Sequence, residues 1–231
     1  AFDPIPELAR CVRDCSGWLH VDGAFGLWAA ASAKYQALAS GLELADSVSV
    51  DCHKWLNVPY DSGVVFVRDA AAHHAAMTLN APYYVTAPGA ERDNSNWVPE
   101  ASRRARGFTV YAALRSLGRK GIAELVDRCC RLAQQMAALL AQGPGVQILN
   151  DVVLNQVLVR FTPRDGGDAD AFTAAVIKRV QEDGTCWLGG TIWQGRRAMR
   201  VAVSNWSTTE KDIEVSASAI LRCAKAAADE G

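Results

Sequence analysis

The stretches Trp18–Gly26, WLHVDGAFG, and Asp46–Trp55, DSVSVDCHKW, decide the fold class. In each of them a short apolar run ends in polar residues, as a buried strand does where it enters a loop. We therefore expect strands over 18–21 and 47–50. Polar residues gathered just beyond strand ends are typical of α/β proteins, whose ligands bind past the carboxyl ends of the strands.

The segments around these two strands complete the α/β pattern. A short helix is expected over 4–14, with proline in its first turn, and an Ala-rich helix over 27–39. The almost wholly apolar run 63–67 predicts a third strand that is buried on both faces. The long connection 79–99 is rich in Pro, Asn and Gly, and a loop of that length is typical of a functional or mobile segment.

Two helices are expected after this connection. Ser102 is expected to cap the first, and Gly118 and Gly121 bracket the break before the second, which runs to about Ala141. The first helix is expected to carry on one face Phe108, Tyr111, Leu114 and Leu117. The stripe expected on the second consists of Leu125, Cys129, Leu132, Met136 and Leu139.

The pattern changes after Gly143-Pro144-Gly145. Alternating residues over 156–161 and 199–204 predict half-exposed antiparallel strands, with an amphipathic helix from Asp168 between them. A last helix is expected after 207–210, which reads as a capping box. We therefore expect two domains: residues 1–142 as part of a large α/β domain, and residues 143–231 as a small α+β domain.

Composition narrows the class of protein. Of 231 residues, 50% are hydrophobic and 21% charged, which is ordinary for a folded globular protein. The net charge of -1 gives no attraction to nucleic acid or to an anionic membrane. The charge-free span 132–150 contains four glutamines and a Gly-Pro-Gly sequence, which argues against a membrane helix. Seven cysteines without metal-ligand spacing favour unpaired thiols and a cytoplasmic location.

Two clusters at strand ends carry chemistry: His20-Val21-Asp22 and Asp51-Cys52-His53-Lys54. Taken singly, the carboxylates could cap turns, the histidines could be partly buried core residues and the lysine could be a solvated charge. Together, a carboxylate and a lysine at the ends of successive strands converge on one crevice. A neutral lysine attacks carbonyl carbon, and a carboxylate suits a protonated ring nitrogen, which is the protein's part in pyridoxal phosphate catalysis.

The motifs also carry a family resemblance. Residues 18–26 resemble the WLHVDAA segment of the group II pyridoxal-phosphate decarboxylases, and residues 46–55 resemble their DS…HKW segment. Ser102–Arg106 with Leu114–Gly118 resembles a third family block. The nearest group is the aromatic-L-amino-acid decarboxylases and their bacterial homologues. The resemblance implies the aspartate-aminotransferase-like α/β fold (fold type I), and a homodimer with the active site at its interface.

The resemblance implies roles for six residues. Lys54 is the Schiff-base lysine, Asp22 the partner of the pyridine nitrogen, and Ala24 the small residue packed on the ring. His53 and Asp51 match positions beside the cofactor phosphate, and His20 matches another position near the cofactor. Aromatic decarboxylases have a neutral Asn at position 51, and a carboxylate beside a phosphate is repulsive unless it is bridged.

Other features depart from the family pattern. Its members are about twice this length, and their phosphate-cradling Gly/Ser turn lies upstream, so we expect the carboxyl-terminal half of such an enzyme. Asn94 stands where aromatic decarboxylases carry a loop tyrosine, and Asn is no general acid. Tyr83 and Tyr84 lie earlier in the same loop, where packing roles are favoured over substitution for that acid.

The expected function is decarboxylation of an L-amino acid, aromatic by resemblance, to an amine and carbon dioxide. One alternative is an aldehyde-forming decarboxylase-oxidase, and another is a non-catalytic fragment. A third is a metal-dependent hydrolase whose ligands would be His20, Asp22, Asp51 and His53.

Three arginines near the third family block are also open to two interpretations. Arg103, Arg104 and Arg106 are expected in the first turn of a helix, where cations oppose the helix dipole. They either form a solvated basic turn or are offset by an acidic group such as Glu100, by a substrate carboxylate or by the second subunit of a dimer.

Overall fold

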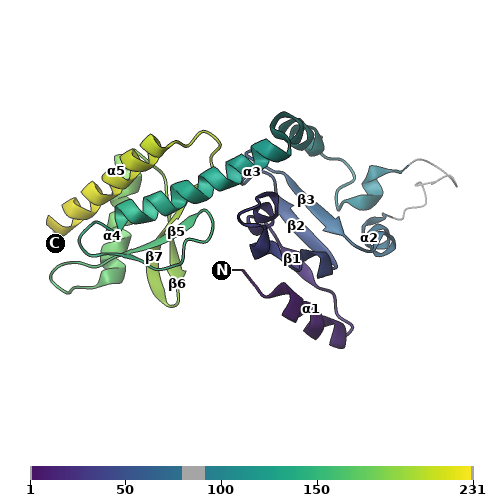
Figure 1. Ribbon diagram of the computed structural model, residues 1–231, viewed down its shortest axis with the longest axis horizontal. Helices are drawn as coiled ribbons and strands as arrows, with labels where there is room; N and C mark the ends of the chain where they lie inside the picture. The colour runs from purple at the N-terminus through teal and green to yellow at the C-terminus, as the bar shows by residue number, and fades with distance from the viewer. Residues whose placement is uncertain (1, 80–91, 230–231) are drawn as a thin grey trace. The chain divides into compact units, whose positions relative to one another are not determined.

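The computed structural model describes residues 2–79 and 92–229 (Figure 1). The chain divides into two compact units, one of Phe2–Ala30 and Tyr35–Arg119, the other of Ala31–Lys34 and Lys120–Gly231. The division near 119 differs from the expected domain boundary at 143, because residues 120–140 pack in the core of the second unit. Where the domains of the whole protein meet stays a prediction.

A small mixed sheet forms the centre of the amino-terminal unit. Its strands are β1 (His20–Asp22), β2 (Ser47–Asp51) and β3 (Gly63–Val67), in the order β1-β2-β3. β1 runs parallel to β2, and β3 runs antiparallel to β2. Helix α1 (Ile5–Asp14) precedes β1 and buries Ile5 and Ala9 in a small apolar cluster. The three expected strands and the first helix are confirmed.

Strand β3 is less buried than its sequence predicts. The side chains of Val65 and Phe66 are 47% and 57% exposed, so the expected burial on both faces is wrong for this chain. β3 lies at the edge of the three-stranded sheet and pairs with β2 alone. The apolar composition of β3 therefore suits a buried strand, but none of the described residues covers its exposed side chains.

Residues 27–39 form no α-helix. The chain makes two 3-10 turns instead, η1 (Gly26–Ala31) and η2 (Gln36–Ala39), followed by η3 (Leu42–Leu44). Between the first two, the Ser32 hydroxyl accepts the backbone N–H of Lys34 and donates to Asp127. Such side-chain bonds compete with the helical ladder, so the Ala-rich composition is overridden here.

Helix α2 (Ala70–Met77) and the turn η4 (Asn94–Trp97) flank the segment outside the described residues. Helix α3 (Arg106–Leu140) then begins three residues later than a cap at Ser102 predicts, and Ser102 does not cap it. Gly118 breaks the helix with a φ of 60°, as its sequence position predicts, whereas Gly121 is helical.

One of the two apolar stripes expected on α3 is buried, and the other is exposed. The second is confirmed, because Leu125, Cys129, Leu132 and Met136 are buried and Leu139 is half-buried against the same core. The first is exposed to solvent in this chain: the four side chains, 38–77% exposed, are Phe108, Tyr111, Leu114 and Leu117.

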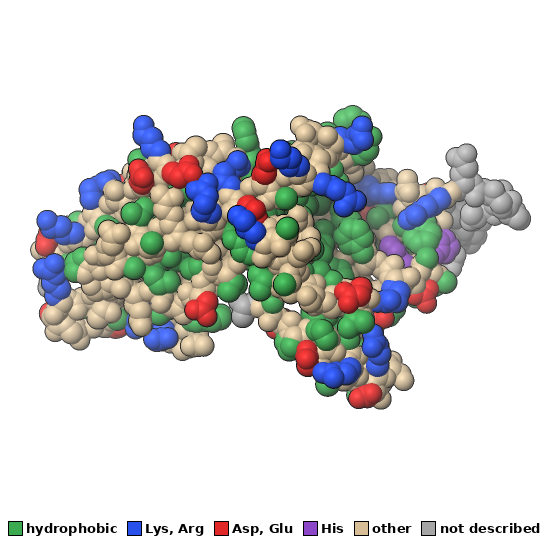
Figure 2. Space-filling model, in the orientation of Figure 1, with side chains coloured by type: hydrophobic (Ala, Val, Ile, Leu, Met, Phe, Trp, Pro, Cys, Tyr) green, Lys and Arg blue, Asp and Glu red, His purple; other side chains and the backbone are tan. Residues whose placement is uncertain are grey.

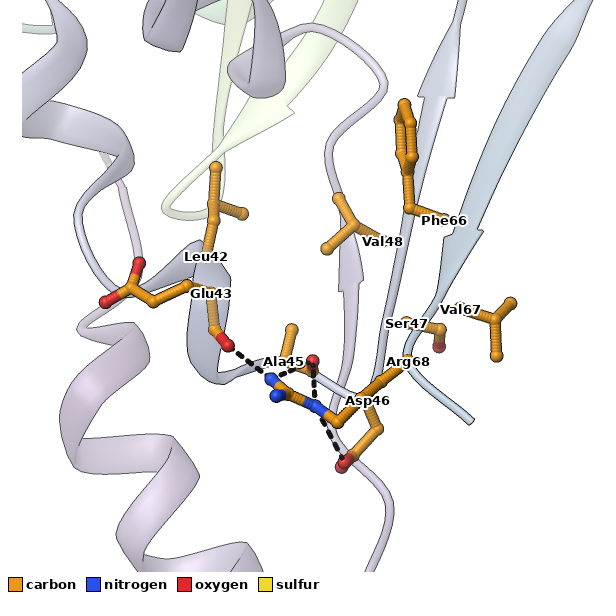
Figure 3. Close-up of a pocket in the computed structure, with 9 residues that line it drawn as sticks. All are labelled: Leu42, Glu43, Ala45, Asp46, Ser47, Val48, Phe66, Val67 and Arg68. Carbon is orange, nitrogen blue, oxygen red and sulfur yellow. Dashed lines mark hydrogen bonds and ion pairs between the residues drawn. The ribbon is translucent and has the colours of Figure 1, made fainter. Parts of the chain in front are cut away.

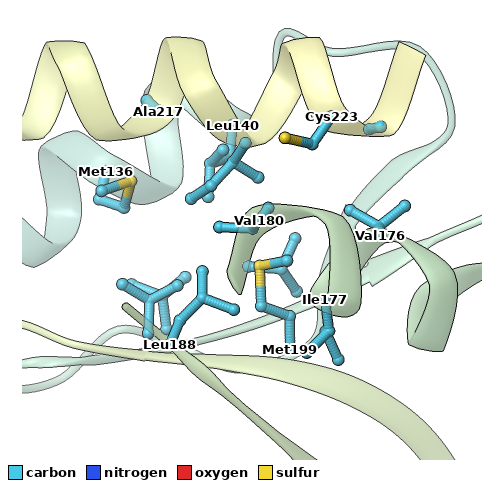
Figure 4. Close-up of a cluster of buried hydrophobic side chains, with 14 of the residues drawn as sticks. Met136, Leu140, Val176, Ile177, Val180, Leu188, Met199, Ala217 and Cys223 are labelled. Carbon is cyan, nitrogen blue, oxygen red and sulfur yellow. The ribbon is translucent and has the colours of Figure 1, made fainter. Parts of the chain in front are cut away.

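The carboxyl-terminal unit is an α+β sandwich, as expected. Its antiparallel sheet has the order β4-β5-β7-β6, formed by β4 (Val146–Ile148), β5 (Gln156–Phe161), β6 (Gly189–Trp193) and β7 (Arg196–Ala202). Two helices, α4 (Ala169–Asp183) and α5 (Glu210–Asp229), complete its core with α3 (Figure 4).

Both helices are capped by side chains. Asp168 caps α4 through the N–H groups of Asp170 and Ala171. The capping box of α5 lies two residues later than expected, because Thr209 and Asp212 exchange the hydrogen bonds.

Two surface properties bear on function. None of the described helices combines the length and apolarity needed to cross a bilayer. On the face shown in Figure 2, basic and acidic side chains are interspersed rather than gathered into one large patch. This agrees with the near-zero net charge.

Candidate active site

The site lies where β1 and β2 end. Because the two strands are parallel, with Asp22 opposite Ser49, the residues after both strands emerge at one edge of the sheet. Gly23 continues the pairing by donating its N–H to the Ser49 carbonyl at 2.9 Å. A Cβ at position 23 would lie 2.7 Å from that carbonyl oxygen, so only glycine fits this close approach.

Lys54 lies between a carboxylate and an aromatic ring. Its Nζ is 2.9 Å from Oδ2 of Asp51, the last residue of β2, which stands three residues earlier. The same nitrogen is 5.0 Å from the ring centroid of Phe25, within the range of a cation–π interaction. The Lys54 side chain is 32% exposed, so its amine is reachable from solvent.

His53 is held beside the same carboxylate. Its Nδ1 lies 3.0 Å from the backbone nitrogen of Ser62 and 2.7 Å from the Ser62 carbonyl oxygen. Its Nε2 is 3.6 Å from Asp51 Oδ2, and its ring stacks at 4.0 Å against Tyr60. The Ser62 contacts and the Tyr60 ring fix the imidazole, which is 15% exposed, next to Lys54 in the chain.

Cys52 lies between these polar residues but is buried. Burial, and then the charge of Asp51, raise the pKa of its thiol. The thiol therefore stays protonated near neutral pH and is not a nucleophile of the site.

One of the two carboxylate oxygens of Asp22 is available to a ligand. Its Oδ1 accepts the backbone N–H of Ala24 at 3.0 Å, which orients the carboxylate at the end of β1. Among the described residues, Oδ2 of Asp22 has no recorded partner and is free to meet a cationic ring nitrogen. Ala24 is half-buried in the turn after it. A partly exposed lysine and an available carboxylate at one sheet edge fit the protein groups that pyridoxal phosphate requires.

His20 is bound to the sheet rather than to the lysine cluster. Its Nδ1 is 2.8 Å from the Ser47 hydroxyl, which also accepts the indole N–H of Trp18 at 2.8 Å. Its Nε2 is 3.4 Å from Ser49 Oγ. These bonds orient the ring along the β1–β2 pair.

The metal-dependent hydrolase is not supported. Across residues 2–79 and 92–229, no three His, Cys, Asp or Glu side chains gather as a metal site would require. Asp51 and His53 share one cluster, whereas His20 bonds to the serines of β2.

The arginines have acidic partners, one of which the sequence did not reveal. Arg106 pairs with Glu100 at 3.0 Å, as one expected alternative holds, and with Asp61 at 2.9 Å. Arg104 pairs with Asp61 at 3.1 Å and bonds to the Tyr60 carbonyl. Arg106 above all holds the pKa of Asp61 at about 2. The segment before α3 is thus tied to the loop that carries Tyr60, the ring stacked on His53.

Arg103 and Arg104 do not lie in the first turn of α3, which begins at Arg106. Arg103 donates to the carbonyl of Glu100 at 3.1 Å. The expected conflict between three cations and the helix dipole therefore reduces to Arg106, whose charge two carboxylates offset.

One open pocket lies away from this chemistry (Figure 3). It has a volume of about 280 Å³ and lies at the opposite end of β2, between η3 and the residues at the end of β3. Arg68 crosses it, but its guanidinium is engaged by the carbonyls of Glu43 and Ala45 and lies 3.9 Å from Asp46. The pocket contains neither Lys54 nor Asp22 and is not the candidate site.

Sequence reasoning missed Phe25 and Asp61. Phe25 stands three residues after Asp22 in the decisive stretch, but its contact with Lys54 depends on how two turns fold together. The Tyr60-Asp61 pair carried no motif, and its arginine partners lie more than forty residues away.

The chain is similar in sequence to a known decarboxylase and to an aldehyde synthase. The chain is 27% identical over 219 residues to an aromatic-L-amino-acid decarboxylase of Bacillus atrophaeus, covering 92% of this chain and 46% of that protein. It is 23% identical over 220 residues to a phenylacetaldehyde synthase of Arabidopsis thaliana, covering 93% and 45%. The chain thus spans about half the length of these relatives.

Solved structures show the same fold. The crystal structure of Oryza sativa TDC with PLP and tryptamine matches with a TM-score of 0.89 at 22% identity, over 98% of this chain and 48% of that one. The expected fold type I architecture is therefore confirmed for the part that this chain holds.

The family model described as the pyridoxal-dependent decarboxylase conserved domain matches residues 1–162. The match is well over half of the chain, and it includes both strand ends with Asp22 and Lys54. The lysine and carboxylate expected from the resemblance lie within it, past two parallel strands. This chain accordingly belongs to the pyridoxal-dependent decarboxylase family.

Proposed function

We propose that the protein carrying this chain removes the α-carboxylate of an L-amino acid, aromatic by preference, and releases an amine and carbon dioxide. The observation that carries the proposal is the emergence of Lys54 and Asp22 at one edge of the parallel β1–β2 pair. When bound, pyridoxal phosphate supplies an electron sink for the electrons that carbon dioxide leaves behind.

The chain's residues have separate tasks in this proposal. Lys54 holds the cofactor covalently through Nζ, which is partly exposed at the sheet edge. Asp22 keeps a proton on the ring nitrogen through its available oxygen, while Ala24 fixes the carboxylate with its N–H. His53, oriented by Ser62 and Tyr60, flanks the lysine, and His20 supports the sheet edge.

Reductive trapping tests the role of Lys54. The chain is incubated with excess pyridoxal phosphate, reduced with borohydride and analysed by mass spectrometry. We expect the phosphopyridoxyl mass on Lys54 in preference to the other five lysines. Lys54→Ala should abolish the site-specific adduct, whereas Lys120→Ala, on an exposed helix face, should leave it unchanged. Uniform labelling of all lysines would refute the assignment.

Asn94 favours a second candidate, an aldehyde-forming decarboxylase-oxidase. Asn94 begins the turn η4, which is anchored by Trp97 against His73 and His74 of α2 at 5.3 Å each. The amide offers no acidic proton to a carbanion. Tyr83 and Tyr84, the alternative acids of this loop, lie outside the described residues.

The two candidates differ in their products. If Asn94 leaves the carbanion without a fast proton source, the protein forms aldehyde and ammonia beside the amine, with oxygen as the oxidant. Asn94→Tyr should then shift the product ratio toward amine. Amine, aldehyde and carbon dioxide are quantified from one aromatic substrate in both proteins, with Asn96→Tyr in the same turn as the control. Clean amine from the unsubstituted protein would count against the second candidate.

We also propose a homodimer in the cytoplasm. The proposal is supported by the exposed apolar stripe on α3 that begins at Phe108 and ends at Leu117, a surface of the kind that subunit contacts cover. Sedimentation of the chain with and without Phe108→Glu measures the association. The location rests on the cysteine content, and the exposed Cys11 and Cys15 form no disulfide in the structure.

A further inference from the structure

At the end of β2, two basic side chains lie beside one carboxylate oxygen. Oδ2 of Asp51 is 2.9 Å from Lys54 Nζ and 3.6 Å from His53 Nε2. The Asp51 backbone carbonyl lies 3.4 Å from the indole nitrogen of Trp28, which donates to it. Asp51 is thus held at its backbone, and its side chain is turned toward the lysine.

The contact with Lys54 is more protected than a typical surface ion pair. The Lys54 and Asp51 side chains are 32% and 30% exposed, and the Phe25 ring lies 5.0 Å from Nζ. By contrast, Lys120 and Glu124 are 90% and 64% exposed and 3.8 Å apart. The partial burial of Lys54 and Asp51 reduces solvent screening of their attraction.

We propose that Asp51 is a positioning residue that holds the amine of Lys54 as an ammonium ion before the cofactor binds, and releases it when the amine reacts. This role for Asp51 deepens the proposed function and rests on it. It also replaces the phosphate contact expected for position 51, because the carboxylate is already engaged with two basic side chains.

The ion pair with Asp51 is expected to slow the reaction of the Lys54 amine. An amine attacks carbonyl carbon through its lone pair, and an ammonium held on a carboxylate has none to offer. Lys54 must therefore leave Asp51 and lose a proton before it reacts. His53 lies on the same oxygen and remains as a partner for the carboxylate once the lysine has left.

Competitive acetylation of the chain measures this pairing without the cofactor. With limiting acetic anhydride at neutral pH, the amine nitrogen bonds to the acyl carbon, acetate leaves and the nitrogen loses a proton. Mass spectrometry gives the acetylation rate of Lys54 relative to the other lysines as internal references. We expect Asp51→Asn to raise the relative rate of Lys54 by about two- to fivefold. Glu124→Gln, the matched control, should change Lys120 by much less, because that pair is more exposed and its charges lie farther apart.

A measurement on the unsubstituted chain guards against misfolding of the variant. Raising the salt concentration to about 1 M weakens a partly buried ion pair only in part. It should therefore raise the relative rate of Lys54 in the native chain by less than Asp51→Asn does, and should leave the rate in Asp51→Asn unchanged. An unchanged Lys54 rate in both the variant and high salt would overturn the proposal.

A second readout separates this proposal from the proposed function. Reductive trapping with pyridoxal phosphate should reach Lys54 sooner in Asp51→Asn than in the native chain if release from Asp51 limits capture. A faster acetylation of Lys54 with no preferential trapping by the cofactor would support the pairing while refuting the cofactor role. Preferential trapping with no effect of Asp51→Asn in either assay would refute the pairing alone.

Discussion

Trp55 offers a sharp test of the packing behind the lysine. The residue directly after Lys54 is 1% exposed, and its ring meets Phe25 edge-on at 6.2 Å. Among the described residues, its buried indole N–H has no hydrogen-bond partner. A buried donor left unsatisfied costs about 1–3 kcal/mol. Replacing Trp55 by Phe removes that donor and keeps most of the ring.

The expected change in the free energy of unfolding follows from two opposing effects. The loss of about 40 Å³ of side chain costs about 1 kcal/mol at about 24 cal/mol per Å³. Relief of the unsatisfied N–H returns about 1–3 kcal/mol. Trp55→Phe should therefore leave the chain between equally stable and about 2 kcal/mol more stable.

Trp28 is the matched control for this substitution. Its indole N–H donates to the Asp51 carbonyl, so Trp28→Phe loses a hydrogen bond in addition to volume. We expect that variant to be destabilised by about 1–2 kcal/mol. Urea denaturation followed by circular dichroism gives both values. If Trp55→Phe is destabilised as much as Trp28→Phe, the Trp55 N–H has a partner in solution and the reasoning is wrong.

Two further predictions concern carboxylates. Asp22→Asn should keep the trapped cofactor on Lys54 but lose most carbon dioxide release, because a neutral amide does not hold the ring nitrogen protonated. Asp151→Asn is the control variant. Near-native turnover in Asp22→Asn would contradict the role of Asp22. The pKa of Asp61 is held at about 2, below the ordinary aspartate value of about 3.9, so its ion pairs stabilise the fold above about pH 4 and are lost as the pH falls toward 2. Asp61→Asn should therefore lower stability at neutral pH and flatten its loss between pH 4 and 2 in acid titrations; a parallel curve would argue against the Arg106 contact.

The sequence predicts the sheet edge well because strand pairing is decided by patterns within a few residues. The apolar runs ending at Asp22 and Asp51 specify two strands, and polar residues after them mark the loops. Parallel pairing then brings both loops to one edge whatever their detailed conformation. The same locality explains the success with Gly118 and with the Asp168 cap, since each acts on its own turn.

Failures occur where a distant segment decides the outcome. Ser32 interrupts the Ala-rich segment by bonding to Asp127, 95 residues away. Arg104 and Arg106 bond to a carboxylate more than forty residues earlier, and α3 begins only after those contacts. Helix propensity and capping patterns contain no information about such partners. The helix expected over 27–39 and the helix start expected at Ser102 are therefore wrong.

The pairing of Asp51 with Lys54 lies between these two cases. Asp51 ends β2 and Lys54 lies three residues later, so their proximity is local, but spacing alone does not say whether the side chains meet. Phe25 and Trp28, from the turn after β1, limit the alternatives by flanking the lysine and holding the Asp51 backbone. The β1–β2 pair thus does more than bring a lysine and a carboxylate to one edge. It also brings the aromatic side chains after β1 to the end of β2, where Phe25 flanks the lysine and Trp28 bonds to the Asp51 backbone.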